Sequence, residues 1–184
     1  MVYPIFKFLF YPFNWVMIKK IKGVENIPDN TAFILVSNHE RRVDSLYLLY
    51  PILKKLDKKL HIITMPTWWF LGDAICRQWA ACIPLFNKEQ AYNESKELIK
   101  SGKIVGIFPE GRLGKKEKKL KTGAVRLAIE TNTPILPIGL KSSYVPFNST
   151  LNIGKLIYPK KGKNVEKQTM GIMKEVYRLR DTLS

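Results

Sequence analysis

Short apolar, β-branched runs alternate along the chain with stretches of helical periodicity, and this alternation limits the fold more than any other feature. Runs that are apolar throughout are typical of strands whose two faces are both covered by helices. We therefore predict an α/β fold, a single-domain αβ sandwich with a mostly parallel or mixed sheet flanked by helices. The predicted strands are Ala32–Ser37, His61–Met65, Cys82–Phe86, Ile104–Phe108, Ile135–Leu140 and Leu151–Tyr158. The predicted helices are Ser45–Leu56, Ala91–Lys100, Ala124–Thr131 and Val165–Leu179, with Met170, Met173, Val176 and Tyr177 on one stripe of the last.

The N-terminal stretch Met1–Ile18 is apolar and aromatic, but a lysine, two prolines and an asparagine interrupt it. It therefore falls short of the ~20 apolar residues that a spanning helix needs. Its positive charges follow the apolar run, whereas a secretory signal carries them first. We predict that residues 1–20 form a retained helical segment lying in the membrane interface, with Lys19, Lys20 and Lys22 on anionic lipid. The alternative is a core helix of a soluble protein. Residues 21–184 show no repeat and no linker, so we expect them to form one domain.

Charge and cysteine content narrow the set of partners. Lys and Arg number 31 against 15 Asp and Glu, giving a net charge of +16, so anionic partners are attracted at long range. Nucleic acid, an anionic membrane and an acidic carrier protein all fit this charge. Two cysteines and two histidines are too few for a disulfide scaffold or a typical zinc site, so we expect a reducing compartment and no metal.

A histidine and an aspartate follow the first predicted strand, where a helix is expected to begin and where open α/β sheets bind ligands. The step from His39 to Asp44 would place the two side chains about 140° apart on a continuous helix. They can therefore meet only if His39 lies on the turn before the helix and Asp44 near its N-terminus. In that arrangement the carboxylate fixes the imidazole tautomer, and the other ring nitrogen can act as a general base on a substrate hydroxyl. The alternative is a helix cap beside a polar residue.

A second strand end carries charges of both signs. The segment Gly106–Arg112 ends an apolar run in a Pro/Gly turn and presents Glu110 and Arg112 together, which suits a substrate with a hydroxyl and a phosphate. The lysine-rich stretch Lys115–Lys121 is either a solvated surface or a binding site for phosphate or lipid headgroups. The aromatic stretch Trp68–Phe70 is expected either in the core or in an interfacial patch that takes in acyl chains.

In their order and spacing these motifs resemble the phospholipid/glycerol acyltransferase family, and within it the bacterial 1-acylglycerol-3-phosphate acyltransferases. The resemblance runs from about Ile21 to Leu140, most of the chain. It rests on an ordered set of short segments: Lys22–Pro28, Asn38-His39 with Asp44, Phe108-Pro109-Glu110-Gly111, Lys121–Ala124 and Thr133–Ile138.

The resemblance implies roles for four residues. His39 corresponds to the general base that deprotonates the hydroxyl of the acyl acceptor, and Asp44 to its orienting partner. Glu110 and Gly111 match the motif that binds the acceptor. The donor would be a thioester, acyl-CoA or acyl-acyl carrier protein, with no other cofactor and no covalent enzyme intermediate. We therefore expect a membrane-associated enzyme of phospholipid biosynthesis, peripheral or monotopic on the cytoplasmic face of the cell membrane, that acylates a lysophospholipid such as 1-acylglycerol-3-phosphate.

Two positions depart from the family pattern. Asn87 stands where the family usually has a phosphate-binding arginine, and Arg112-Leu113 replaces a threonine-arginine pair. We expect Arg112, Lys88 or a lysine of the 115–121 stretch such as Lys115 to contact the phosphate instead. Otherwise the acceptor is another lysolipid or a glycerol compound.

Two other classes of function use parts of the same sequence. A non-enzymatic basic module could bind membrane or nucleic acid, but the chain lacks a known nucleic-acid scaffold with interleaved basic and aromatic residues, so no nucleic-acid partner is expected. A hydrolase could use His39 to activate water, but no Gly-x-Ser-x-Gly nucleophile elbow is present.

Overall fold

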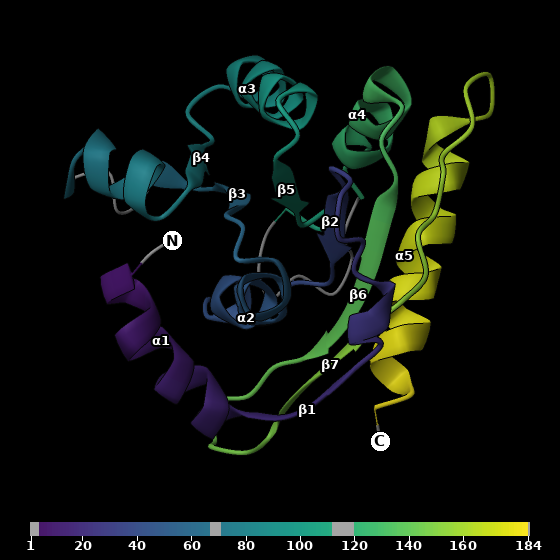
Figure 1. Cartoon of the computed structure of the whole chain (residues 1–184). Coiled ribbons are helices and arrows are strands. Elements are labelled where there is room, and N and C mark those ends of the chain that lie inside the picture. Colours follow the sequence, from purple (N-terminus) through teal and green to yellow (C-terminus); the bar gives the residue numbers. More distant parts are fainter. Residues whose placement is uncertain (1–3, 67–70, 112–119, 184) are drawn as a thin grey trace.

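The computed structural model describes residues 4–66, 71–111 and 120–183, whose strands form one sheet with helices on both faces (Figure 1). The strands are β1 (Ile18–Lys22), β2 (Ile34–Ser37), β3 (Leu60–Thr64), β4 (Cys82–Pro84), β5 (Ile104–Ile107), β6 (Ile135–Lys141) and β7 (Ser149–Ile153). The helices are α1 (Pro4–Met17), α2 (Asp44–Leu56), α3 (Lys88–Lys100), α4 (Gly123–Thr131) and α5 (Val165–Asp181), with a 3₁₀ turn η1 (Val24–Asn26) and a π-helical turn η3 (Ala74–Trp79).

The sheet is mixed and its strands lie in the order β1-β7-β6-β2-β5-β3-β4. The central strands from β6 to β4 run parallel, while β7 pairs antiparallel with β6 and parallel with β1. The predicted α/β fold with a mixed, helix-flanked sheet is therefore confirmed. Because β2 lies in the middle, the segment that leaves its carboxyl end has neighbouring strands on both sides.

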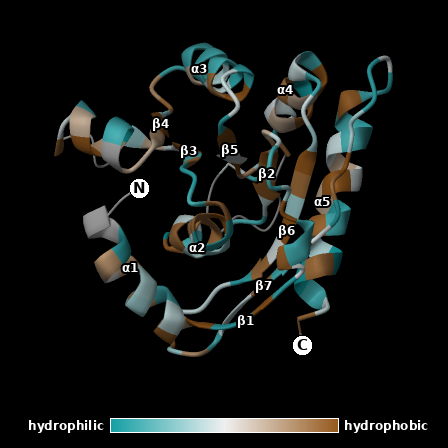
Figure 2. Cartoon of the chain, viewed as in Figure 1, coloured by the Kyte–Doolittle hydropathy of each residue, from teal (hydrophilic) through white to brown (hydrophobic). Residues whose placement is uncertain are grey.

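Two hydrophobic cores lie on opposite faces of the sheet. Alternation along β2 sends Leu35 into one core and Ile34 and Val36 into the other, as the two-residue period of a strand requires. The first core is closed by α1 and α2, and the second by α3, α4 and α5 (Figure 1). Figure 2 shows hydrophobic residues concentrated along β2, β5 and β6. These strands are mainly apolar because helices cover both faces of the sheet.

Each predicted strand and helix is present, with displaced ends. The largest displacement is in β7, predicted over Leu151–Tyr158 but observed two residues earlier at its start and ending at Ile153. The next residue, Gly154, packs closely under α5, where an added Cβ would lie 2.7 Å from Leu179 Cδ1. Beyond this point one isolated bridge joins Ile157 to Ile135.

One residue of the stripe predicted on α5 is placed wrongly. Met173 and Val176 are buried, and Tyr177 is partly buried against the same core, but Met170 is largely exposed. At 100° per residue, Met170 lies about 120° around the helix from Val176, so it falls beside the buried face rather than on it.

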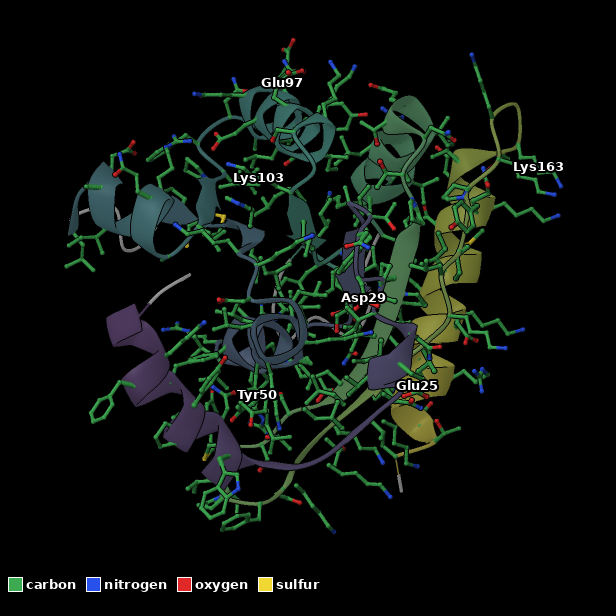
Figure 3. The ribbon with its side chains drawn as sticks, in the orientation of Figure 1. Glu25, Asp29, Tyr50, Glu97, Lys103 and Lys163 are labelled. Carbon is green, nitrogen blue, oxygen red and sulfur yellow. The ribbon has the colours of Figure 1, made fainter. Side chains whose placement is uncertain are left out.

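The N-terminal helix is two-sided. Phe10, Asn14 and Met17 are buried, whereas Phe8 and Trp15 are 80% and 68% exposed. The buried side packs against Tyr50 of α2, which Figure 3 shows on the side of α2 facing α1. In the described part of the chain, no helix is both long enough and apolar enough to cross a bilayer.

The sheet also includes β1, a strand that the sequence pattern does not predict. β1 continues directly from α1 and pairs with β7, so the expected division between residues 20 and 21 falls inside a strand. Lys19 and Lys20 are exposed on this edge strand. Their place in the sheet means that the start of the chain is part of the domain's packing, while contact of these lysines with lipid stays a prediction.

Candidate functional site

The candidate site lies where two neighbouring parallel strands end at the same edge of the sheet. β2 pairs with β5, with Val36 opposite Ile107, so the segments that follow these two strands leave the sheet about 4.8 Å apart. The segment after β2 carries His39, and the segment after β5 carries Phe108–Gly111. Parallel pairing thus brings the two motifs of the sequence together.

The predicted contact between His39 and Asp44 is present. His39 lies on the turn before α2, Asp44 is the first residue of that helix, and the Nδ1 to Oδ2 distance is 2.9 Å. The backbone N–H groups of Glu40 and Arg41 donate to the same oxygen at 2.6 and 2.9 Å. Asp44 is fully buried, so these donors rather than water solvate the Oδ2 of its carboxylate. A carboxylate accepts only, so Nδ1 carries the proton and the basic lone pair of the ring is on Nε2.

The carboxylate of Glu110 holds the backbone of the His39 turn. Its Oε2 accepts the His39 backbone N–H at 3.0 Å, and its Oε1 accepts the hydroxyl of Tyr177 at 2.8 Å. Glu110 is 7% exposed. Burial and the adjacent Glu110 carboxylate raise the pKa of Tyr177 above its ordinary value of 10, so its hydroxyl is protonated and donates at neutral pH. A direct contact of Glu110 with the acyl acceptor stays a prediction.

The C-terminal helix α5 makes a second contact with the same turn. The guanidinium of Arg180 lies 3.6 Å from the carboxylate of Glu40 and 5.2 Å from the ring centre of Tyr177. Helical periodicity predicts Tyr177 on a packed stripe, but no signal in the sequence indicates that α5 reaches the histidine turn. These two residues are the main part of the site that sequence reasoning missed.

Two further residues fix the orientation of the histidine. The ring of Phe108 stacks on the imidazole of His39, with ring centres 4.1 Å apart and planes 17° apart. Asn38 bonds both ways to Leu140 on β6, its Nδ2 donating to the carbonyl at 2.8 Å and its Oδ1 accepting the N–H at 2.9 Å. The ring face is thus covered and the end of β2 is anchored, so the imidazole is held before any substrate binds.

Arg41 connects the histidine turn to the loop between β6 and β7. Its Nε donates to the carbonyl of Ser142 at 2.8 Å, and its guanidinium lies 4.9 Å from the ring centre of Tyr144. The hydroxyl of Tyr47 on α2 donates to the carbonyl of Ser143 in the same loop at 2.7 Å.

The remaining predicted binding residues are spread along the same edge. Gly111 has φ of +70°, a left-handed conformation that favours glycine, and its N–H donates to Phe108 at 3.0 Å to close the turn. Lys88 is exposed at the start of α3, after β4, three strands and about 14 Å from β2. Asn87 caps this helix by accepting the N–H groups of Glu89 and Gln90.

Arg112, Lys115 and Trp68–Phe70 lie outside the described residues, as does most of the lysine-rich stretch. Within the described ranges, no three His, Cys, Asp or Glu side chains gather in a way that could hold a metal ion.

Comparison with known proteins gives relatives of one kind. The chain is 24% identical over 152 residues to a 1-acyl-sn-glycerol-3-phosphate acyltransferase of Borreliella burgdorferi, covering 76% of this chain and 60% of that protein. It is 27% identical over 122 residues to the protein of the same name from Bacillus subtilis, covering 64% and 60%. The chain thus spans about 60% of the length of these two relatives.

A solved structure has the same fold. The crystal structure of the 1-acyl-sn-glycerophosphate (LPA) acyltransferase PlsC from Thermotoga maritima matches with a TM-score of 0.72 and 23% identity, covering 94% of this chain and 75% of that one. A family model, Acyltransferase, matches residues 18–141, a range that includes the His39–Asp44 pair and the Phe108–Gly111 turn. This chain therefore belongs to the acyltransferase family.

Proposed function

We propose that this chain transfers a fatty acyl group from an acyl thioester, acyl-CoA or acyl-carrier protein, to the free hydroxyl of a lysophospholipid, 1-acylglycerol-3-phosphate, in phospholipid synthesis. The observation that carries the proposal is the buried Asp44 carboxylate bonded to Nδ1 of His39 at the carboxyl end of the central strand. The relatives named 1-acyl-sn-glycerol-3-phosphate acyltransferase support this choice of acceptor.

The reaction needs one base and no nucleophilic side chain. His39 Nε2 takes the proton of the acceptor hydroxyl as the oxygen attacks the thioester carbonyl carbon. The tetrahedral intermediate collapses, the carbon–sulfur bond breaks, and the imidazolium returns the proton to the leaving thiolate. Asp44 stabilises the imidazolium that exists between these steps. The contacts from Glu110 and Phe108 hold the ring in one orientation, which lowers the entropic cost of the attack.

The charge of the chain suits these substrates. The phosphate of the acceptor and the phosphates of CoA or an acidic carrier are all anionic, and the net charge is +16. Lys88 lies at the same sheet edge as His39 and is the first residue of α3, a helix whose N-terminal dipole favours phosphate. We assign Lys88 to this phosphate recognition, with Arg112 and Lys115 as further candidates.

Membrane association belongs to the same proposal. The exposed aromatic side of α1 and the lysines that follow it form an amphipathic segment of the kind that lies in a lipid interface. An acceptor that resides in a bilayer and a donor that is soluble in the cytoplasm both reach an enzyme bound to the cytoplasmic face of the membrane.

The test uses the purified full chain with labelled acyl-CoA or acyl-carrier protein and a panel of lysolipids, with products identified by mass. We expect acylated 1-acylglycerol-3-phosphate, and a loss of turnover of about 10²–10⁴ in His39→Ala. The matched control is His61→Gln, because His61 is the only other histidine and lies on β3, outside the turn. Free fatty acid as the main product would instead indicate a hydrolase. Equal turnover in His39→Ala and the parent would remove the proposed base.

A further inference from the structure

The loop between β6 and β7 leaves several apolar side chains on the surface. Tyr144, Val145 and Phe147 are 56%, 60% and 54% exposed. Single exposed apolar residues are common on proteins, but neighbouring ones on one short loop mark a surface that binds something apolar.

The loop lies against the end of α1. The ring centres of Phe147 and Trp15 are 6.2 Å apart in an edge-to-face contact, and the N–H of Phe147 donates to the carbonyl of Val16 at 2.7 Å. Figure 1 shows this loop beside the end of α1 that continues into β1. Two segments far apart in the sequence therefore form one exposed apolar surface. We refer to Trp15, Tyr144, Val145 and Phe147 as the aromatic rim.

The backbone holds the rim in place and is strained at its apex. The hydroxyl of Ser143 accepts the N–H of Val145 at 3.0 Å, and Ser143 and Ser149 bond to each other in both directions. Phe147 has φ of +55°, a conformation that glycine and asparagine adopt at lower cost than a large side chain does. More than half of this side chain is exposed, so the contact with Trp15 covers only part of the ring.

Charge around the rim indicates its partner. Lys19 and Lys20 follow α1 directly and are exposed on the edge strand. Aromatic side chains flanked by lysines are typical of surfaces that bind at the boundary of an anionic bilayer, where rings lie at headgroup depth and lysines contact lipid phosphates.

We propose that the aromatic rim inserts into the interface of an anionic lipid bilayer, so that the loop between β6 and β7 docks on the membrane together with the end of α1. Arg41, which lies between His39 and Asp44 in the sequence, bonds to this loop through Ser142 and Tyr144. Docking by the rim therefore sets the His39 turn close to the bilayer. The delivery of a bilayer-resident acceptor rests on the proposed function, whereas the lipid contact itself does not.

The test compares two double variants of the full chain for flotation with vesicles of phosphatidylglycerol and phosphatidylcholine. Val145→Ser with Phe147→Asn removes apolar surface from the rim, and asparagine tolerates the positive φ. The control is Tyr158→Asn with Met170→Ser, whose parent residues are 64% and 56% exposed. Tyr158 lies beside the far end of β6, about 20 Å along the strand from the loop, and Met170 is on α5.

We expect the rim variant to bind vesicles about tenfold or more weakly and the control to bind like the parent. Parental binding by the rim variant, or an equal loss in the control, would overturn the proposal. A change in oligomeric state of the rim variant without vesicles, together with unchanged vesicle binding, would identify the rim as a protein interface and also overturn it. Melting curves check the fold, and Val145→Asp, which alters one exposed residue, replaces the double variant if that one unfolds.

A turnover assay with two forms of the acceptor separates this inference from the proposed function. A short-chain lysophosphatidic acid kept below its micelle concentration reaches the site without a bilayer. We expect the rim variant to turn over this acceptor within about threefold of the parent, and to lose tenfold or more with the acceptor embedded in vesicles. Absence of turnover in the parent with both acceptors would refute the proposed function, while the flotation result would still decide on the rim.

Discussion

Replacing Asp44 with asparagine separates the structural role of this buried carboxylate from the effect of its negative charge on His39. Its Oδ2 receives the Nδ1–H of His39 and the backbone N–H groups of Glu40 and Arg41, at 2.6–2.9 Å. Asparagine has nearly the same shape, and its amide oxygen can accept the same three bonds. The substitution therefore keeps the turn in place and removes the negative charge beside the imidazole.

In Asp44→Asn, the expected loss of stability is moderate and the expected loss of turnover is large. A hydrogen bond to a charged acceptor contributes about 1.5–3 kcal/mol and a neutral one about 0.5–1.5, so three bonds lose about 3 kcal/mol together. Relief from burying a charge offsets part of this loss. At roughly 2–4 °C per kcal/mol for a chain of this size, the unfolding midpoint falls by at most about 12 °C. Turnover falls by about 10²–10⁴, because a neutral amide does not stabilise the imidazolium of His39.

The assay pairs thermal melts with initial rates at a temperature where every variant is folded. Asp44→Ala is the comparison, because it leaves the N–H groups of Glu40 and Arg41 without their acceptor, at about 1–3 kcal/mol each. We expect the alanine variant to be clearly less stable than the asparagine variant and equally inactive. If folded Asp44→Asn kept its rate within tenfold of the parent, the carboxylate would be only a structural cap and the assignment of His39 as base would lose its electrostatic support.

Contacts outside the His39–Asp44 pair can be tested by single substitutions and by pH. Tyr177→Phe removes the hydroxyl bonded to Glu110, and we expect kcat to fall about tenfold, worth ~1.4 kcal/mol, with KM nearly unchanged. The melting temperature should fall by several degrees, because the buried carboxylate loses a donor at a cost of about 1–3 kcal/mol. A loss seen only in stability would contradict a positioning role. Gly139→Ala should lower the free energy of unfolding by about 1–3 kcal/mol and the melting temperature by several degrees or more. The reason is that the new Cβ would lie 2.1 Å from the backbone nitrogen of Arg180. An unchanged melting temperature would contradict this close packing. Burial and nearby lysines lower the pKa of His61 from 6.5 to about 4. As the pH falls, the unfolded chain therefore takes up a proton on His61 before the folded chain does. The contribution of neutral His61 to stability is complete above pH 6.5 and is lost as the pH drops toward 4. We expect a loss of about 1–2 kcal/mol after allowance for solvent screening, measured as melting temperature against pH, and absent in His61→Gln.

The parts of the fold that could be predicted are those whose signal is local. The central strands β2 and β5 are short apolar runs because helices cover both of their faces, and such runs are visible in the sequence. The contact between His39 and Asp44 could also be predicted, since a five-residue spacing across a strand-to-helix turn leaves few geometries.

The parts that could not be predicted depend on distant partners. β1 has the sequence IKKIK, and its lysines are tolerated because it is an edge strand with two exposed positions. Directly after an apolar aromatic helix, this run resembles the basic flank of a membrane segment, and only its pairing with β7 identifies it as a strand. The hydroxyl of Tyr177 meets Glu110 through packing of α5 on the sheet, which periodicity cannot specify.

The family match ends at residue 141, yet the site it contains depends on the helix that follows. α5 packs on β6 so closely that only a glycine fits beneath Arg180, and this approach brings Tyr177 to Glu110 and Arg180 toward Glu40. Since Glu110 in turn holds the backbone N–H of the histidine, the position of the imidazole is linked to the packing of a helix outside the matched region. Changes along α5 should therefore alter turnover more than acceptor affinity, because they move the base rather than the groups that bind phosphate.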